Sequence, residues 1–494
     1  MGVVARQTTL TSVASYLGIA LGLVNKFLLF PNLLQSAEVG LSNFIVELSI
    51  FLSQYSLIGV PSVILKFFPV YQDKKSGHQG FLFLNLLIST AGLILFFILF
   101  WIFKEPALNY FSLKSPLIVD YYGYVLLLIA SMVYQKVFIA VLRSLYKTFV
   151  PGFVNDVIIR ILTTVVIFLY AIKLVNFDVF VLLYTAVNCL PMIIFVVYLY
   201  FLRQAFFFST ISDGLKKNFR KILLFGTASF LNETAMGLVM NVSAIMLAGM
   251  VGLSEVGVYT TVLYITSTIV IPGRNLIASS APRVAELWVN FDKEKLSHLY
   301  KRVTVINSIT SFLFFILIWV NFENLFSLIP DKYMIGQWAL MLLGLSRLVD
   351  SLTGLNAGIL VTSPKYWVDP LLNIILFVTA IWLNSIWIPL YGITGAAAAT
   401  FLSYGSVNIL RSVLIQLFWG LHPFSAGFFI VCAGAAFSLL VDLIIPYLGN
   451  HILDLVVRSF VVGGLFCGFF VYFNASPDIN GHLRTMLRKI KMIK

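Results

Sequence analysis

Ionisable side chains inside long apolar runs are the residues of this sequence whose chemistry most needs explaining. The segment 267–283, STIVIPGRNLIASSAPR, carries Arg274 directly after Pro272 and Gly273, a pair that can bend a helix. Irregular backbone at membrane depth is tolerated where it is buried in protein or lines a water-filled cavity. We therefore expect Arg274 to face an aqueous cavity, where its guanidinium suits phosphate or carboxylate. The alternative is an interhelical pair with an acid such as Glu233.

Four pairs of opposite charges also lie within the apolar runs. Residues three or four positions apart share a helix face, and the rise per residue places others at one depth in neighbouring spans. The first kind are Asp156–Arg160 and Arg347–Asp350, and the second kind are Lys26–Glu47 and Asp442–Arg458. We expect structural pairing for these residues, and a functional role for at least one pair stays open.

Glu233 and Lys136, like Arg274, have no opposite charge at a suitable spacing. Glu233 falls near the centre of its apolar run, and Lys136 lies toward the cytoplasmic half of its own. Intramembrane charges of this kind are expensive and mark functional sites by default. Arg411, near the inner end of a run, can instead snorkel to the interface.

The sequence lacks the common motifs of nucleotide-hydrolysing enzymes, zinc proteases and serine hydrolases. It contains no G-x-x-x-x-G-K-[ST], H-E-x-x-H or G-x-S-x-G, and its five histidines and three cysteines form no ligand set. We expect no enzyme activity, no cofactor and no metal. A membrane-embedded glycosyltransferase or polymerase is the less favoured alternative, because none of the expected outer loops is long enough for a catalytic domain.

The elements that carry these charges are membrane-spanning helices. The chain is 60% hydrophobic and 11% charged, with a mean hydropathy of +0.97, and runs of about 20 apolar residues, the length of one span, recur throughout. The sequence predicts an all-α polytopic membrane protein with fourteen spans. They lie at about 10–31, 41–66, 81–103, 118–143, 150–172, 177–201, 221–248, 256–281, 303–327, 335–361, 368–389, 393–418, 425–447 and 451–473.

Lysine and arginine are concentrated in alternate loops. By the positive-inside rule this places both termini in the cytoplasm, as an even number of spans requires. The net charge of +13 is therefore a topology signal, and we expect no nucleic-acid partner. The basic tail, 475–494, is expected to rest on anionic membrane lipids.

Segment 202–221 is the most polar interruption in the first half and separates six spans from the next six. We expect it to be a cytoplasmic loop between two lobes. The expected domains are a six-helix lobe at 1–201, a second at 222–420, two extra helices at 421–474 and the tail.

The two lobes carry traces of an internal repeat. Residues 37–41 read AEVGL and residues 254–258 read SEVGV, an offset of 217. At the same offset, Lys66 corresponds to Arg283. Six spans per copy predict parallel repeats related by an axis along the membrane normal, an arrangement that many transporters build around a midplane site.

Two motifs resemble those of a known family. Glu38-Val39-Gly40 stands between the first two spans, and LYGITGAAAAT at 390–400 joins spans 11 and 12 as a tight turn followed by small residues. Both are similar to the polysaccharide biosynthesis (O-antigen) flippases of the multidrug/oligosaccharidyl-lipid/polysaccharide exporter superfamily. The resemblance implies two six-helix lobes around a central cavity with alternating access. It also implies transport of a polyprenyl-diphosphate-linked oligosaccharide to the outer leaflet of the bacterial cytoplasmic membrane.

The resemblance further implies a cavity lined by spans 1, 2, 7 and 8. In this sequence it points to Lys26, Glu47, Asn232, Glu233, Asn241 and Arg274. Arg274 and Lys26 would meet the diphosphate, and we assign Lys136 to the same role. Glu233 would bind a coupling ion, a proton or sodium, or orient Arg274. A polysaccharide polymerase is the protein partner to consider.

Two other members of the superfamily remain as alternatives. The two extra C-terminal spans resemble those of lipid II flippases, but those proteins are richer in arginine in a first span that here carries only Lys26. Cation-coupled multidrug exporters often use an acid in that span, and none is present here.

Overall fold

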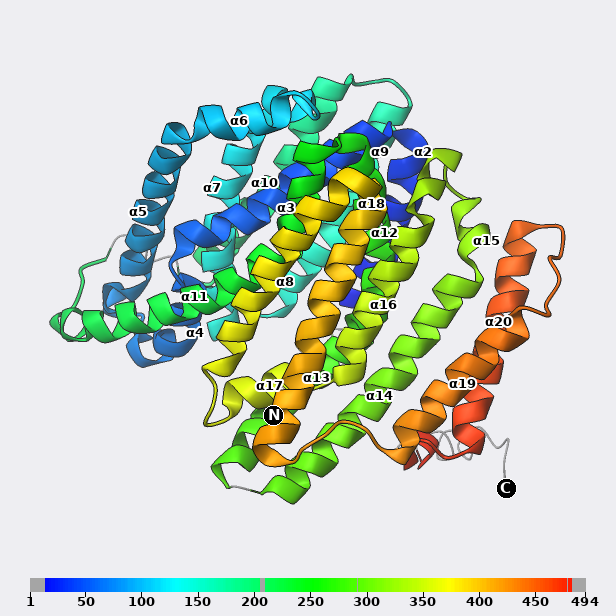
Figure 1. Ribbon diagram of the computed structural model, residues 1–494. Coiled ribbons are helices and arrows are strands. Elements are labelled where there is room, and N and C mark those ends of the chain that lie inside the picture. Colours follow the sequence, from blue (N-terminus) through cyan, green and yellow to red (C-terminus); the bar gives the residue numbers. More distant parts are fainter. Residues whose placement is uncertain (1–13, 205–208, 291, 478, 482–494) are drawn as a thin grey trace. The chain divides into compact units, whose positions relative to one another are not determined.

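The computed structural model describes residues 14–204, 209–290, 292–477 and 479–481, with the backbone alone at 231–240, 275 and 289. Every regular element in these residues is a helix (Figure 1). Contacts divide the chain after Thr260 into two compact units, 1–260 and 261–494, which are described separately below. The predicted lobe boundaries at 201 and 222 remain a prediction.

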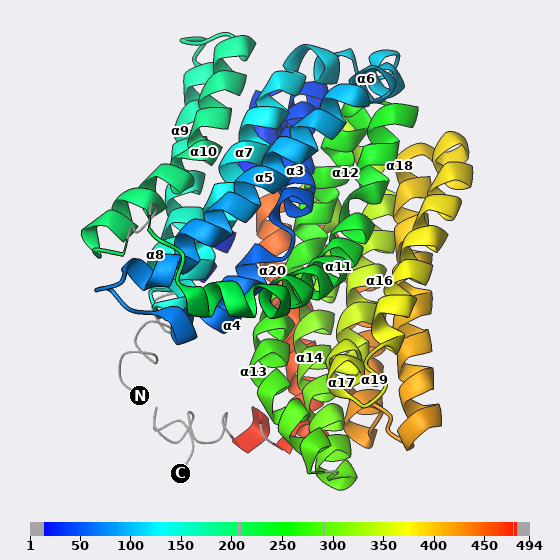
Figure 2. The same ribbon diagram turned by 90° about the vertical axis from the view of Figure 1, so that its left-hand side faces the viewer.

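Unit 1 begins with a helix over 14–33 that contains a π-helical turn. Helix α7 packs against α3, α5 and α10, and α3 also packs against α5. Helix α9 lies beside α10 (Figure 2). In chain order its elements are η1 (Val24–Leu29), α2 (Phe30–Leu33), α3 (Ser36–Leu57), α4 (Val60–Tyr71), η2 (Gly77–Gly80), α5 (Phe81–Ile102), α6 (Lys104–Ser112), α7 (Pro116–Ser144), α8 (Phe149–Phe153), η3 (Val154–Ile158), α9 (Ile159–Ala171), α10 (Phe177–Phe201) and α11 (Asp213–Met250).

Helix α12 (Leu253–Ser267) crosses the division between the units. The elements of unit 2 follow it as η4 (Thr268–Val270), α13 (Ile271–Val289), α14 (Lys293–Val320), α15 (Phe322–Phe326), η5 (Asp331–Gly336), α16 (Gln337–Thr353), α17 (Asn356–Thr362), α18 (Val368–Trp419), α19 (Ala426–Asp442) and α20 (His451–Tyr472).

Each of the fourteen predicted spans corresponds to a helix in the described ranges. Ten helices are long and apolar enough to cross a membrane by themselves, and α16 with α17 meets the same criterion as a pair bent by 50°. Helix α11 and the shorter apolar α19 account for two more. The fourteenth is the second arm of α18, which folds back on itself.

The reversal of α18 occurs at Gly392, whose φ of 53° and ψ of −126° leave the helical region. Asp369 and Arg411 form an ion pair although they are 42 residues apart in this element. A straight helix would separate them by roughly 60 Å, so the two arms must be antiparallel, as Figure 1 shows. The predicted tight turn between spans 11 and 12 is confirmed.

The polar segment 202–221 is only partly a loop. Helix α11 already begins at Asp213, because the hydroxyl of Ser212 accepts a hydrogen bond from the backbone N–H of Leu215. Such an N-cap, followed by an acid in the first turn, stabilises a helix start. The seventh helix therefore begins about two turns before the apolar run.

Repeat-related glycines bring α3 and the start of α12 into close contact within unit 1. A Cβ atom added at Gly40 would overlap the carbonyl oxygen of Leu253, and one added at Gly257 would overlap that of Ser36. Both the two glycines and the two carbonyl residues differ by the offset of 217. The contact is therefore reciprocal, as between two copies related by a twofold axis.

The same register recurs one turn along these helices. The side-chain amide of Asn43 donates to the hydroxyl of Thr260 at 2.9 Å, and these residues also differ by 217. The sequence repeat at residues 37–41 and 254–258 thus corresponds to a structural pairing of α3 with α12. The parallel arrangement of two six-helix copies stays a prediction.

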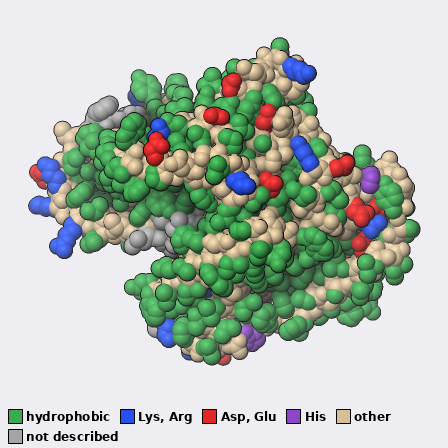
Figure 3. Space-filling model, turned by 45° about the horizontal axis from the view of Figure 1, so that its top comes forward, with side chains coloured by type: hydrophobic (Ala, Val, Ile, Leu, Met, Phe, Trp, Pro, Cys, Tyr) green, Lys and Arg blue, Asp and Glu red, His purple; other side chains and the backbone are tan. Residues whose placement is uncertain are grey.

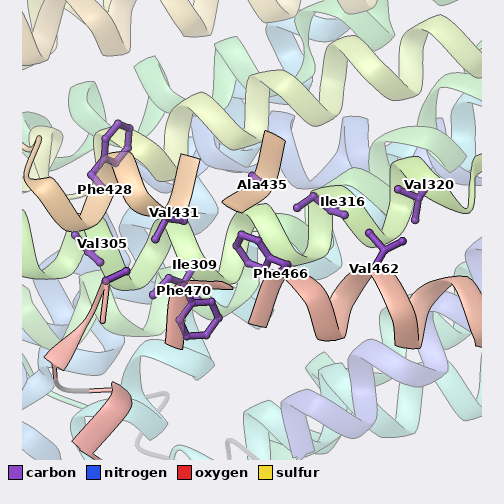
Figure 4. Packing of buried hydrophobic residues seen from close by; sticks show 11 residues of the cluster. Val305, Ile309, Ile316, Val320, Phe428, Val431, Ala435, Val462, Phe466 and Phe470 are labelled. Carbon is purple, nitrogen blue, oxygen red and sulfur yellow. The ribbon is translucent and has the colours of Figure 1, made fainter. Parts of the chain in front are cut away.

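The last two helices dock on α14 through a continuous apolar core (Figure 4). Helix α14 contributes Ile309 and Ile316, α19 contributes Val431, and α20 contributes Phe466 and Phe470. All five side chains are buried. This core fixes the extra helices to unit 2.

Large apolar side chains also cover much of the surface, as the face in Figure 3 shows. Trp101 is 75% exposed and Phe460 is 85% exposed. A protein in water rarely leaves so many such side chains uncovered, so these surfaces face lipid. The chain is a multi-pass membrane protein.

Candidate substrate site

A 3-10 turn interrupts the α-helical hydrogen-bond ladder before Arg274, one turn earlier than Pro272. Helix α12 ends at Ser267, the 3-10 turn η4 follows, and the N–H of Ile271 bonds to the carbonyl of Thr268. Proline has no N–H to continue an α-helical ladder and is favoured in the first turn of a helix. Pro272 therefore stands at the start of α13, and Arg274 follows in its first turn.

The side chain of Arg274 is exposed, and no ion pair joins it to another described side chain. It lies within electrostatic range of Arg347, Asp350 and Tyr404 in unit 2. The acid proposed as its alternative partner, Glu233, has a side chain outside the described part of the structure. The expectation of an accessible guanidinium is consistent with this geometry.

Arg347 and Asp350 do not form the predicted local pair. The carboxylate of Asp350 accepts a hydrogen bond from the amide of Asn408 at 3.2 Å. Arg347 is only 7% exposed, and no ion pair within the described residues reaches it. A spacing of three residues allows the two side chains to meet on one helix face. In the structure, the carboxylate of Asp350 is instead hydrogen-bonded to Asn408 of α18.

Arg411 does not snorkel, contrary to expectation. Its Nε lies 2.8 Å from Asp369 Oδ1, and both side chains are less than a tenth exposed. Its two terminal nitrogens donate to Asn373 Oδ1 at 2.6 Å and to Asn408 Oδ1 at 3.2 Å. Arg411 is therefore neutralised inside unit 2 by an acid that sequence reasoning missed.

The positions of Asp369 and Arg411 relative to the turn at Gly392 could have predicted their ion pair. Asp369 precedes the turn at Gly392 by 23 residues and Arg411 follows it by 19. The two arms of a helical hairpin therefore hold them at a similar depth.

Lys26 lies in the π-helical turn η1, a local irregularity that often occurs at functional sites. Its ammonium donates to Asn43 Oδ1 and lies 4.8 Å from the ring centre of Phe30. Glu47 interacts with it electrostatically, in agreement with their predicted common depth. Asn43 was missed, although it joins Lys26 to the α3–α12 contact through Thr260.

Lys136 donates to two groups of α3. Its ammonium lies 2.9 Å from the carbonyl oxygen of Ile50 and 2.8 Å from the hydroxyl of Ser53. These bonds link α7 to α3 and satisfy two of the N–H donors of the ammonium within unit 1. The assignment of Lys136 to the substrate stays a proposal.

Of the remaining predicted pairs, Asp442–Arg458 is confirmed and Asp156–Arg160 is wrong. Arg458 lies 2.8 Å from Asp442 and 3.0 Å from a further acid, Asp454. Asp156 instead accepts from the hydroxyl of Ser15 at 2.8 Å. Arg160 donates to the carbonyl of Gly18, so both residues of this pair hold the first span.

The other predicted site residues, Asn232, Glu233 and Asn241, all belong to α11. The side chains of Asn232 and Glu233 lie outside the described part, and Asn241 is half-buried. The structure thus gathers two groups, each in its own unit. Lys26, Asn43 and Glu47 lie together in unit 1, whereas Arg274, Arg347 and Asp350 lie together in unit 2.

These helices and their intramembrane charges define a class, polytopic helical membrane proteins with the fold of exporter-superfamily transporters. The structure is similar to that of the lipid II flippase MurJ in an inward closed conformation, with a TM-score of 0.74 and 15% identity over 95% of this chain and 100% of that one. It is also similar to an inward-facing multidrug resistance MATE family transporter of the MOP superfamily. There the TM-score is 0.61, with 16% identity over 83% of this chain and 94% of the other.

No curated protein sequence matches the chain. A family model described as polysaccharide biosynthesis protein matches residues 4–288, more than half of the sequence. The chain belongs to the polysaccharide biosynthesis protein family. The resemblance drawn from residues 38–40 and 390–400 is confirmed at the level of the family.

Proposed function

We propose that this protein is a flippase for polyprenyl-diphosphate-linked oligosaccharides. It moves the repeat units of a surface polysaccharide such as O-antigen from the inner to the outer leaflet of the bacterial cytoplasmic membrane by alternating access, with both termini in the cytoplasm. The observation that carries the proposal is Arg274, an exposed guanidinium behind a helix break, with a second arginine nearby in a protein of this family.

The chemistry of such a substrate fits these features. A diphosphate needs a fixed positive charge, and a guanidinium binds phosphate oxygens through charge-assisted hydrogen bonds. The polyprenyl tail requires only an apolar surface, which the exposed hydrophobic side chains supply. A neutral saccharide can be held by scattered amide and hydroxyl groups and leaves no compact motif.

The remaining candidates keep their proposed roles in this account. Lys26 and Lys136 are proposed diphosphate contacts, and a proton or sodium is the proposed coupling ion. The residues proposed to line the cavity or to bind the coupling ion are Glu47, Asn232, Glu233 and Asn241. Membrane lipids and a polysaccharide polymerase are the proposed further partners.

Translocation in proteoliposomes tests the proposal. Vesicles are loaded with a polyprenyl-diphosphate-linked oligosaccharide, and the saccharide that becomes accessible to an added glycosidase is measured over time. We expect the wild type to expose it and Arg274→Ala to reduce the rate at least about tenfold, the effect of losing a charge-assisted contact.

The matched control is Arg283→Ala, which removes an exposed arginine of the same helix, paired with Glu286 at 2.7 Å. It should leave the rate unchanged. Lipid II as the only substrate moved would favour the lipid II flippase alternative. Uptake of organic cations without lipid movement would favour the multidrug exporter.

A further inference from the structure

Arg347 is a buried cation that forms no ion pair with any side chain in the described part of the structure. It lies on α16 with 7% of its surface exposed, and its Nε has no hydrogen-bond partner in the described structure. The nearest aromatic group, Tyr404, has its ring centre 6.0 Å from the guanidinium carbon, at the outer limit of a cation–π contact. A buried charge without a partner is strongly unfavourable, so this arrangement requires an explanation.

The acids on α16 and α18 that could pair with Arg347 have other partners. Asp350 accepts from Asn408 at 3.2 Å, and Asn408 is itself fixed by the amide of Asn356, which donates to its carbonyl at 3.2 Å. Asp369 is held by Arg411 at 2.8 Å. Asp369 is thus neutralised by Arg411, whereas Asp350 keeps its negative charge, since its hydrogen bond comes from a neutral amide.

A second arginine increases the imbalance. Arg274 lies within electrostatic range of Arg347, and the one nearby carboxylate that interacts with it is Asp350 among the described residues. Two guanidiniums and one carboxylate give this part of unit 2 a net charge of +1. Two like charges near each other repel, and an anion between them would relieve the repulsion.

We propose that Arg347 and Arg274 together form a site for a phosphate-type dianion. The accessible Arg274 makes the first contact, and the buried Arg347 supplies a preformed fork whose Nε and terminal nitrogens are not committed to an acid. Under the proposed function, on which this identification rests, the anion is the diphosphate of the lipid-linked substrate. A free inorganic diphosphate offers the same chemistry.

The first test measures inorganic pyrophosphate binding to the purified full-length protein by thermal unfolding and by calorimetry. Arg347→Met should unfold at the wild-type temperature or higher without ligand, because an unpaired buried charge is replaced by an apolar side chain of similar length. It should lose the stabilisation by pyrophosphate, with a dissociation constant raised at least about tenfold. Arg283→Met, the exposed control on α13, should behave as the wild type.

Unchanged pyrophosphate affinity in Arg347→Met would overturn the inference, whatever its stability. Should this variant fail to fold, Arg347→Lys decides the matter. It keeps the charge without the planar fork, so we expect an affinity several-fold weaker than that of the wild type, and an unchanged affinity would again contradict the site.

Nanodiscs separate the two sources of the anion. Arg347-dependent binding of a polyprenyl diphosphate embedded in the disc supports the lipid substrate. Arg347-dependent binding of pyrophosphate alone keeps the anion site but contradicts the proposed function. Normal lipid translocation by Arg347→Met keeps the proposed function and contradicts this inference. A wild type that binds neither probe overturns both.

Discussion

At the scale of single residues, Arg411 and Asp369 form the most deeply enclosed ion pair that the described structure contains, and Arg411 also donates hydrogen bonds to Asn373 and Asn408. Removing one member leaves the other charged and buried. Removing both leaves no uncompensated charge and can be nearly neutral. The pair is therefore a structural element of the α18 hairpin.

We predict that Asp369→Leu or Arg411→Met alone destabilises the protein by roughly 3–5 kcal/mol, whereas the double variant recovers most of this loss. Thermal unfolding in detergent measures all three. Lys295→Ala, which removes an exposed pair with Asp292, should change stability by less than about 1 kcal/mol. Additive losses in the double variant would contradict the account.

A variant of Lys136 can show whether this residue stabilises the fold, binds the substrate, or does both. Because its ammonium bonds to Ile50 and Ser53 on α3, Lys136→Met should lower the unfolding temperature. As a proposed diphosphate contact, Lys136 should also be needed for full pyrophosphate affinity, so the variant should bind pyrophosphate more weakly. Calorimetry and unfolding of the same preparation provide both readings. An unchanged pyrophosphate affinity beside a lowered unfolding temperature would contradict the proposed contact with the diphosphate and leave Lys136 a structural role alone.

The sequence predicted which charges are buried better than it predicted their partners. Asp442–Arg458 followed from depth alone. Arg347–Asp350 and Asp156–Arg160 failed because spacing on one helix shows only which side chains can meet. Partners from distant segments, Asn408 and Ser15, compete for the same carboxylates, and their positions depend on tertiary packing.

At the scale of elements, the crossing of α3 and α12 depends on Gly40 and Gly257. Each glycine lets a carbonyl of the other helix approach where a Cβ atom would overlap it. Because the two contacts are related by the repeat, their energetic effects should be similar.

We predict that Gly40→Ala and Gly257→Ala each destabilise the protein by about 1–3 kcal/mol, the usual effect of overpacking. Gly464→Ala is the control, since a Cβ atom there meets no other atom within 4 Å. Unfolding temperatures compare the three. A stable Gly257→Ala protein beside a destabilised Gly40→Ala protein would argue against the reciprocal contact.

Helices and the turn at Gly392 were readable from the sequence because long apolar runs and a small-residue turn have strong local signals. Their ends were less readable. The start of α11 depends on the cap at Ser212, and the break before α13 falls at 268–270 rather than at Pro272. The docking of α19 and α20 on α14 is a tertiary property that no local pattern encodes.

At the scale of the whole molecule, composition predicted a polytopic helical membrane protein, and short motifs predicted the family to which the chain belongs. The composition is a property of the whole sequence, whereas the motifs at 38–40 and 390–400 are local patterns. The substrate, by contrast, depends on a few side chains. Arg274 was recognised because it is a charge in an apolar run, whereas the significance of Arg347 appeared only when its expected partner was found bonded to Asn408.

The most direct test of the central claim is native mass spectrometry of the gently purified protein, comparing the wild type with Arg274→Ala and the control Arg283→Ala. We predict that the wild type and the control retain a polyprenyl diphosphate saccharide and that Arg274→Ala loses it. The mass of this lipid would also define the saccharide. Absence of any such lipid from the wild type, together with binding of organic cations, would contradict the flippase and favour an exporter of cationic compounds.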